Sequence, residues 1–482
     1  MFAAVALAAC SRAPIPVVDR IAILPFDNLS GDPSLDWVSN AAPSILAEQL
    51  VGSPKTVPLR VPTVSDAYLS AATRFVHGDF VQAHGALRFE IQVEDAARHK
   101  MIAHDDLNGA VLDAMNRAAH TLDPHAQPFS TSNPEAVAAW AQGQEERATT
   151  LDPDFGEAWI AWAESLAARG QTSDAIAVAA RGLDRSTLRS PIDRARLAVL
   201  SATLRKDLSA HVQALSDLQR LDPADTALLQ RLAETEMLAR NFPASAASYQ
   251  VLLQVEPDNT AALLALGYAQ AFSGDVDAAR RTFETYGKRE GQKPNSLDSI
   301  GEAYFMNGRF TEAQKYFQEA HQSSPAFLDS ADLQKAAFAQ WLAGDLKAAD
   351  LTMARYLEFR SKSHDPLLAW REASWDYSTG RREQAIQTLS RAPRQIAERQ
   401  LNDWNTPLPA DLDALKQAYE QTAPSSDGIA RVRYAAALFR VGRLEEARKL
   451  VQRWPLPGEN ADSLLESTVF PLFLDLRKTL VK

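Results

Sequence analysis

A chain of 482 residues is too long for one compact core, so it is expected to form several cores or a quasi-linear array. Apolar residues make up 46% and charged residues 23%, which is typical of a folded soluble protein and excludes general disorder. The formal net charge of -11 gives no electrostatic basis for general nucleic-acid binding, so no nucleic-acid partner is expected.

The chain has one cysteine, Cys10, which excludes an intrachain disulfide and a thiolate metal cluster. The string leucine-alanine-alanine-cysteine at 7–10 resembles the lipobox of bacterial lipoproteins. This resemblance implies that residues 1–17 are a signal and linker and that a lipidated Cys10 anchors a soluble body to a membrane. It places that body on the periplasmic side of a bacterial cell envelope, and Ser11 favours the outer membrane. No Lys or Arg precedes Cys10, so an internal methionine start and a plain apolar terminus remain alternatives.

The segment 18–127 is predicted to be a small α/β domain. Leu87, Phe89, Ile91 and Val93 alternate with charged or polar residues, which indicates a strand with one face on a core. The expected elements are a strand over 20–26, a helix over 34–51 that ends at Gly52, a hairpin of strands 74–82 and 87–93, and a helix over 106–122.

The string at 21–33 (IAILPFDNLSGDP) is similar to the opening of TolB N-terminal-like domains, and the resemblance covers about residues 18–125. Such domains occur in bacteria ahead of tetratricopeptide arrays, but the motif does not determine an activity. The loop 28–32 lacks the Gly-Lys-Ser/Thr of a phosphate loop and is predicted to be a structural turn. The histidines here do not have zinc-ligand spacing, so we expect no metal and no cofactor.

The segment 133–482 carries an internal repeat. Prolines at 153, 223, 257 and 325 are separated by 70, 34 and 68 residues, close to multiples of the tetratricopeptide period. We therefore expect an all-α tetratricopeptide repeat (TPR) superhelical solenoid, with degenerate units at 192–225 and 393–426 and a C-terminal capping helix over 464–480.

Small residues explain how two helices of a unit pack. Gly267 and Gly301 are expected to let neighbouring helices approach closely. Gly274 and Gly308 are expected to end the first helix and permit a tight turn.

The tetratricopeptide resemblance implies that set positions of each first helix line a concave groove. Those positions here are largely aromatic and favour an apolar or amphipathic protein segment as partner. They are Tyr268, Phe272, Phe305, Met306, Phe338, Trp341, Trp370 and Tyr377. The alternative is that each of these side chains is packed in the core between neighbouring repeats. The Lys/Asn clamp that holds a terminal carboxylate is absent, because its positions hold Leu264, Tyr268, Asp298, Glu302, Gln334 and Phe338.

No nucleophile elbow, phosphate loop, dinucleotide-binding glycine string or zinc helix occurs in the sequence. The sequence therefore favours a non-enzymatic, lipid-anchored scaffold that binds proteins through its repeats. The alternative is a regulatory protein whose α/β domain senses a ligand and whose repeats relay it, or an accessory subunit of an enzyme.

Overall fold

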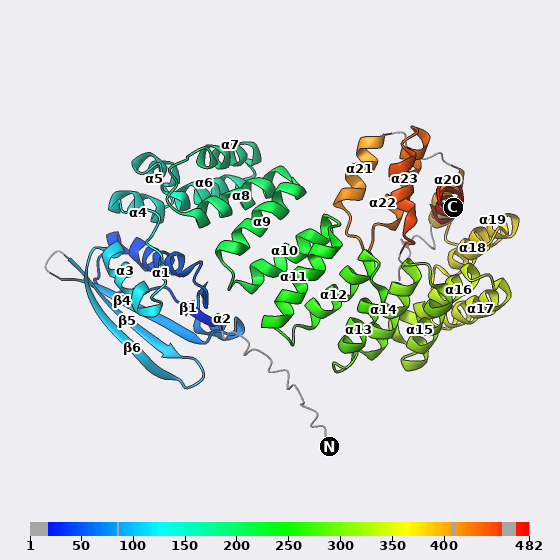
Figure 1. Cartoon of the computed structure of the whole chain (residues 1–482), viewed down its shortest axis with the longest axis horizontal. Coiled ribbons are helices and arrows are strands. Elements are labelled where there is room, and N and C mark those ends of the chain that lie inside the picture. The colour runs from blue at the N-terminus through cyan, green and yellow to red at the C-terminus, as the bar shows by residue number, and fades with distance from the viewer. Residues whose placement is uncertain (1–17, 84–85, 406–410, 456–468, 482) are drawn as a thin grey trace, which may run out of the picture. The chain divides into compact units, whose positions relative to one another are not determined.

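The computed structural model describes residues 18–83, 86–405, 411–455 and 469–481 (Figure 1). The chain divides into two compact units, Met1–Leu232 and Ala233–Lys482. The first unit contains a mixed β-sheet followed by helix pairs, and the second consists of helices (Figure 1). The expected fold class, a small α/β region followed by an array of paired helices resembling tetratricopeptide repeats, is confirmed.

The sheet has the strand order β3-β1-β4-β5-β6, and β2 pairs with β4. Its strands are β1 (Asp19–Ile23), β2 (Asp27–Asn28), β3 (Thr56–Arg60), β4 (Arg74–Ala83), β5 (Ala86–Asp95) and β6 (Lys100–Gly109). The strand β1 runs parallel to β3 and β4, whereas β4, β5 and β6 are antiparallel. The predicted hairpin is confirmed as β4 and β5, and its turn at 84–85 lies outside the described residues.

Strand alternation divides the apolar side chains between the two sheet faces. Ile21, Ile23 and Val76 share a core with α1 (Trp37–Leu50) and α3 (Val111–Leu122). Ala22 and Phe75 share a smaller core with Ala67 of α2 (Val64–Leu69). Helices therefore cover both faces of the sheet, because each face carries its own row of apolar residues.

The helix predicted over 106–122 begins at Val111, so the first part of that prediction is wrong. Residues 106–109 end β6, where Leu107 pairs with Phe89. The spacing between Leu107 and Val111 fits a helix, which is why the predicted helix includes Leu107. It instead faces the sheet core, since pairing with β5 supplies its backbone hydrogen bonds.

Six helices complete the first unit as three pairs. They are α4 (Pro134–Ala141), α5 (Glu145–Leu151), α6 (Gly156–Ala168), α7 (Thr172–Leu183), α8 (Pro191–Arg205) and α9 (Leu208–Leu221), and α10 (Thr226–Leu238) follows them. Phe129, Val137 and Phe155 belong to the same core as Ile45 and Met115 of the α/β region. The predicted boundary near 127–133 therefore marks a change of secondary structure within one continuous core.

The second unit contains the remaining helices. They are α11 (Phe242–Val255), α12 (Thr260–Ser273), α13 (Val276–Tyr286), α14 (Lys293–Met306), α15 (Phe310–Ser323), α16 (Ala331–Leu342), α17 (Leu346–Lys362), α18 (Leu368–Ser378), α19 (Arg382–Leu389), α20 (Arg394–Asn405), α21 (Leu412–Gln421), α22 (Gly428–Arg440), α23 (Leu444–Gln452) and α24 (Val469–Leu480). The predicted terminal helix corresponds to α24, and the residues 464–468 predicted to begin it lie outside the described residues.

The turns inside the helix pairs have the left-handed backbone conformation that glycine favours. Gly274 and Gly308 have φ values of 91° and 77°, as expected from their positions in the repeat. In the degenerate repeat at 192–225, Lys206 stands where most of the other repeats have the turn glycine. It takes the same left-handed conformation, with a φ of 56°. The repeat geometry is therefore kept where the sequence signature is lost, at the cost of a strained lysine.

Two glycines inside first helices are required by close packing. A Cβ atom on Gly267 would lie 2.4 Å from the Phe283 ring, and one on Gly301 would lie 2.6 Å from the Phe317 ring. Both phenylalanines are fully buried. The expectation that these glycines allow the helices of a pair to approach closely is confirmed.

Gly301→Ala is therefore expected to lower the free energy of unfolding of the second unit. Overpacking of a filled core costs about 1 to 3 kcal/mol, which exceeds the gain of about 1 kcal/mol from the better helix former. The measurement is urea unfolding of the full chain followed by circular dichroism. In a Phe317→Leu background the loss should shrink, and stabilisation by Gly301→Ala in the wild-type chain would contradict the packing argument.

Candidate functional site

The eight predicted groove residues all lie in the second unit, two on each of four successive first helices. Tyr268 and Phe272 are on α12, Phe305 and Met306 on α14, Phe338 and Trp341 on α16, and Trp370 and Tyr377 on α18. We call the side of α12, α14, α16 and α18 that carries these eight residues the first-helix face. The regular placement follows from the repeat, which puts equivalent residues at equivalent positions.

The first-helix face does not present an exposed aromatic strip. Phe305 and Met306 are 0% exposed and Phe338 is 1% exposed, so they offer no surface to a partner. Phe272 and Trp370 are also buried, whereas Tyr268, Trp341 and Tyr377 are half-buried. The prediction of a continuous open groove therefore needs correction. The five buried residues are packed core, which was the alternative interpretation.

The segment that follows α23 covers α12 and α14. The Arg453 guanidinium lies 4.4 Å from the centroid of the Phe272 ring. The Trp454 ring contacts Phe305 edge-on, with centroids 6.5 Å apart, and its backbone N–H donates to the Met306 carbonyl at 3.0 Å. Arg453 and Trp454, which are adjacent in the chain, therefore contact predicted groove residues on two consecutive first helices.

Helix α24 covers α16, and helix α20 covers α18. Phe470 of α24 packs edge-on against Phe338 and Trp341, with centroid distances of 5.8 and 6.0 Å. Trp404 of α20 stacks on Tyr377 at 4.2 Å. The aromatic positions that the repeat pattern selects thus bind apolar side chains of this same chain.

A charged cluster is buried beneath the first-helix face. The Lys335 ammonium, on a side chain that is 0% exposed, donates to Asp298 Oδ1 and to Glu302 Oε1, each at 2.8 Å. The Tyr268 hydroxyl donates to Glu302 Oε2 at 2.7 Å. Three first helices, α12, α14 and α16, are therefore joined by one polar network.

Burial dominates the electrostatics of this cluster. It raises the pKa of Asp298, and Lys335 opposes the shift by stabilising the carboxylate. Burial also raises the pKa of Tyr268, with the Glu302 carboxylate as the next cause. Asp298, Glu302 and Tyr268 occupy the positions at which related repeats carry a carboxylate clamp, whereas Lys335 lies at no position that the repeat pattern selects. A lysine within the apolar stretch of α16 was the available signal.

No family model and no curated protein matches the chain in sequence. Solved structures that are similar to it include a MamA protein, at 16% identity over 36% of this chain and 94% of that chain, with a TM-score of 0.30. YrrB, described as a TPR protein with an unusual peptide-binding site, matches at 14% identity over 40% of this chain and 97% of its own, with a TM-score of 0.32. Naa15/Naa10 bound to HypK-THB matches at 16% identity over 66% and 61% of the two chains, with a TM-score of 0.34. Similarity this low carries no statement about function.

Two sequence-based predictions remain untested by the structure. The resemblance of 21–33 to TolB N-terminal-like domains has no matching family model behind it. Cys10 and the lipobox lie outside the described residues. Within the described part of the chain, none of the helices combines the length and apolar character that crossing a bilayer requires.

Lys335→Met is expected to lower the free energy of unfolding of the second unit by about 3 to 5 kcal/mol. Removing one partner of a buried ion pair leaves the others, here Asp298 and Glu302, without compensation in a medium of low dielectric. Urea or thermal unfolding of the full chain measures the change.

The matched control is Lys315→Met, because Lys315 forms an exposed pair with Glu319 on α15. That substitution should cost less than about 1 kcal/mol. Adding Asp298→Asn to Lys335→Met should recover part of the loss. Equal effects of Lys335→Met and Lys315→Met would show that the buried network does not hold α14 and α16 together.

Proposed function

We propose that the second unit is a non-enzymatic protein-interaction scaffold whose first-helix face binds an amphipathic helix of a partner in exchange with α24. The observation that supports this proposal is the occupation of the face by the chain's own C-terminal helix. The face already accommodates an apolar helix, which indicates the chemistry of the ligand that it accepts.

The apolar side of α24 defines that chemistry. Its buried residues are Val469, Phe470, Phe473 and Leu476, at the spacing of one helical face. The basic residue Arg477 follows, and its guanidinium donates to the Val451 carbonyl at 2.6 Å. A partner is therefore expected to present a short helix with two aromatic residues one turn apart and a basic residue in the last turn.

Tethering explains why such a face can be selective. A segment joined to its own binding site competes at a high effective concentration, which can reach the order of millimolar. A partner helix must therefore bind the face more tightly than the tethered α24 does, or the contacts of α24 with the face must first be weakened. The covered face also keeps large apolar side chains out of water when no partner is bound.

A labelled peptide of residues 469–481 tests the exchange. It should bind a full chain carrying Phe470→Ser and Phe473→Ser at least tenfold more tightly than the wild-type chain, because the weakened α24 no longer competes. Fluorescence anisotropy gives both dissociation constants. Peptide binding should also raise the melting temperature of the double variant.

The control is the same peptide with both phenylalanines replaced by serine, which should bind neither chain. Circular dichroism must show that the double variant keeps its helices. Failure of the native peptide to bind this helical variant would overturn the proposed exchange.

We further propose that the chain is anchored to a bacterial envelope membrane, on the periplasmic side, through a lipid on Cys10. The support is the sequence string at 7–10 alone. A lipid group that carries at least two acyl chains would attach the body stably to the membrane without a spanning helix.

Cys10→Ala should accordingly move the protein from the membrane fraction to the soluble fraction of cells that express the full chain. Immunoblotting of the two fractions measures the shift, and Cys10→Ala should also prevent incorporation of a labelled fatty acid. Unchanged fractionation of the variant would remove the anchor from the proposal. Ser11→Ala serves as the control, since it preserves the cysteine.

A further inference from the structure

Three arginines of the second unit lie near one carboxylate. Arg240 is in the turn between α10 and α11, Arg431 is in α22, and Arg453 follows α23. Asp427, directly before α22, pairs with Arg240 and with Arg431, each at 3.2 Å. These four groups carry two positive charges in excess, in a protein whose formal net charge is -11.

Two of the three guanidinium groups are used within the fold. The Arg240 guanidinium donates to the carbonyls of Tyr419 and Thr422 at 2.9 and 3.1 Å. The Arg431 guanidinium donates to two backbone carbonyls at the end of α23. One oxygen of Asp427 pairs with each of these arginines, so neither oxygen is left for a third.

The guanidinium of Arg453 has no such role. It lies 4.4 Å from the centroid of the Phe272 ring and 5.2 Å from that of the Phe242 ring. It donates no hydrogen bond within the described part of the chain. A guanidinium that stacks on an aromatic ring still has its N–H groups available in its own plane. Arg453 is therefore a positioned cation with unused donors.

The donors of Arg453 are also reachable. A side-chain nitrogen without a hydrogen bond is either buried or in contact with water. In this cluster the buried ones are Nε of Arg240 and Nε of Arg431, and none belongs to Arg453. The Arg453 side chain is only half-buried. An acceptor can therefore approach Arg453 from solvent.

The surroundings of Arg453 disfavour its positive charge. Burial, followed by the charge of Arg431, lowers the pKa of Arg453 to about 9. The guanidinium is still protonated at neutral pH. A bound anion would oppose both effects, because it supplies negative charge and hydrogen-bond acceptors at the same point.

We propose that Arg453 is the centre of an oxyanion site that binds a phosphate or carboxylate group of a ligand, with Arg431 and Arg240 adding electrostatic attraction. A guanidinium pairs with either group through two parallel hydrogen bonds. A cation would meet three guanidinium groups, and an apolar ligand would leave the Arg453 donors unpaired. None of these arginines belongs to α24, so the site does not depend on the proposed helix exchange.

Isothermal titration calorimetry of the full chain at pH 7.5 tests the site with two probes. They are inorganic phosphate and an acetylated, amidated tetrapeptide that contains two glutamates. Sodium chloride keeps the ionic strength constant, because screening weakens the pairing of exposed charges. At least one probe should bind saturably at one site per chain. Tighter binding of phosphate assigns the site to a free phosphate group, and tighter binding of the peptide assigns it to acidic side chains of a protein.

Arg453→Met should weaken binding of the tighter probe at least tenfold, a difference of about 1.4 kcal/mol. Methionine removes the charge but keeps an unbranched apolar side chain over Phe272 and Phe242, so the fold should survive. Arg448→Met is the matched control, because Arg448 is exposed on α23 and pairs with Glu445. It should leave binding unchanged. Arg453→Lys keeps the charge and should bind more tightly than Arg453→Met.

Three outcomes would overturn the proposal. The first is the absence of saturable binding by either probe. The second is full affinity in Arg453→Met. The third is an equal loss of affinity in Arg448→Met and Arg453→Met, which would indicate general attraction of anions to the surface. If Arg453→Met melts at a lower temperature than the wild-type chain, Arg453→Lys decides the question, because full loss of binding in a folded chain that keeps the charge would also contradict the site.

Discussion

A helix pair with one apolar side cannot leave that side in water, and this constraint organises both units. Removing apolar surface from water stabilises a fold by roughly 25 cal/mol per Å². Neighbouring pairs cover part of the surface, and the first helices still present a side that stacking alone does not bury. In each unit another part of the same chain lies on that side. The α/β region does so in the first unit, and α20, α24 and the Arg453–Trp454 segment do so in the second.

Each covered surface contains a buried or half-buried ion cluster. Arg196 joins Glu48 of the α/β region to Glu157 of α6 in the first unit. In the second unit Lys335 joins α16 to α14 through Asp298 and Glu302. Such pairs contribute little net stability, but separating their partners leaves uncompensated charge. The clusters therefore oppose any rearrangement that separates the elements they connect.

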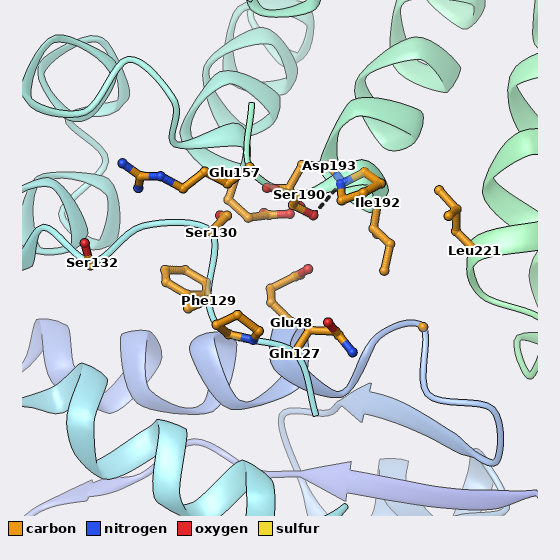
Figure 2. Close-up of a pocket in the computed structure, with 14 residues that line it drawn as sticks. Glu48, Gln127, Phe129, Ser130, Ser132, Glu157, Ser190, Ile192, Asp193 and Leu221 are labelled. Atoms are coloured by element: carbon orange, nitrogen blue, oxygen red, sulfur yellow. Dashed lines mark hydrogen bonds between the residues drawn. The ribbon is translucent and has the colours of Figure 1, made fainter. Parts of the chain in front are cut away.

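The first-helix sides of the two units are covered by different parts of the chain and to different extents. Aromatic rings from α20, α24 and Trp454 cover the first-helix face of the second unit. The corresponding space in the first unit is filled incompletely and leaves a pocket of about 490 Å³ lined by Glu48, Phe129 and Asp193 among others (Figure 2). The two units thus differ in how completely other parts of the same chain fill the side of their first helices.

The sequence by itself determined the features that local rules encode. Proline spacing, the positions of the turn glycines and strand alternation predicted the helix pairs, their turns and the β4–β5 hairpin, since each depends on residues close in the chain. Contacts between residues far apart in the chain decided the features that the sequence did not predict. Leu107 lies in β6 because β5 pairs with it. Five of the eight predicted groove residues are buried, and later segments of the chain pack against Phe305 and Phe338. Arg196 and Glu48 are 148 residues apart and Lys335 and Asp298 are 37 apart, so no local pattern could connect them. Periodicity identifies which side of a helix is apolar, but only the tertiary structure decides what buries it.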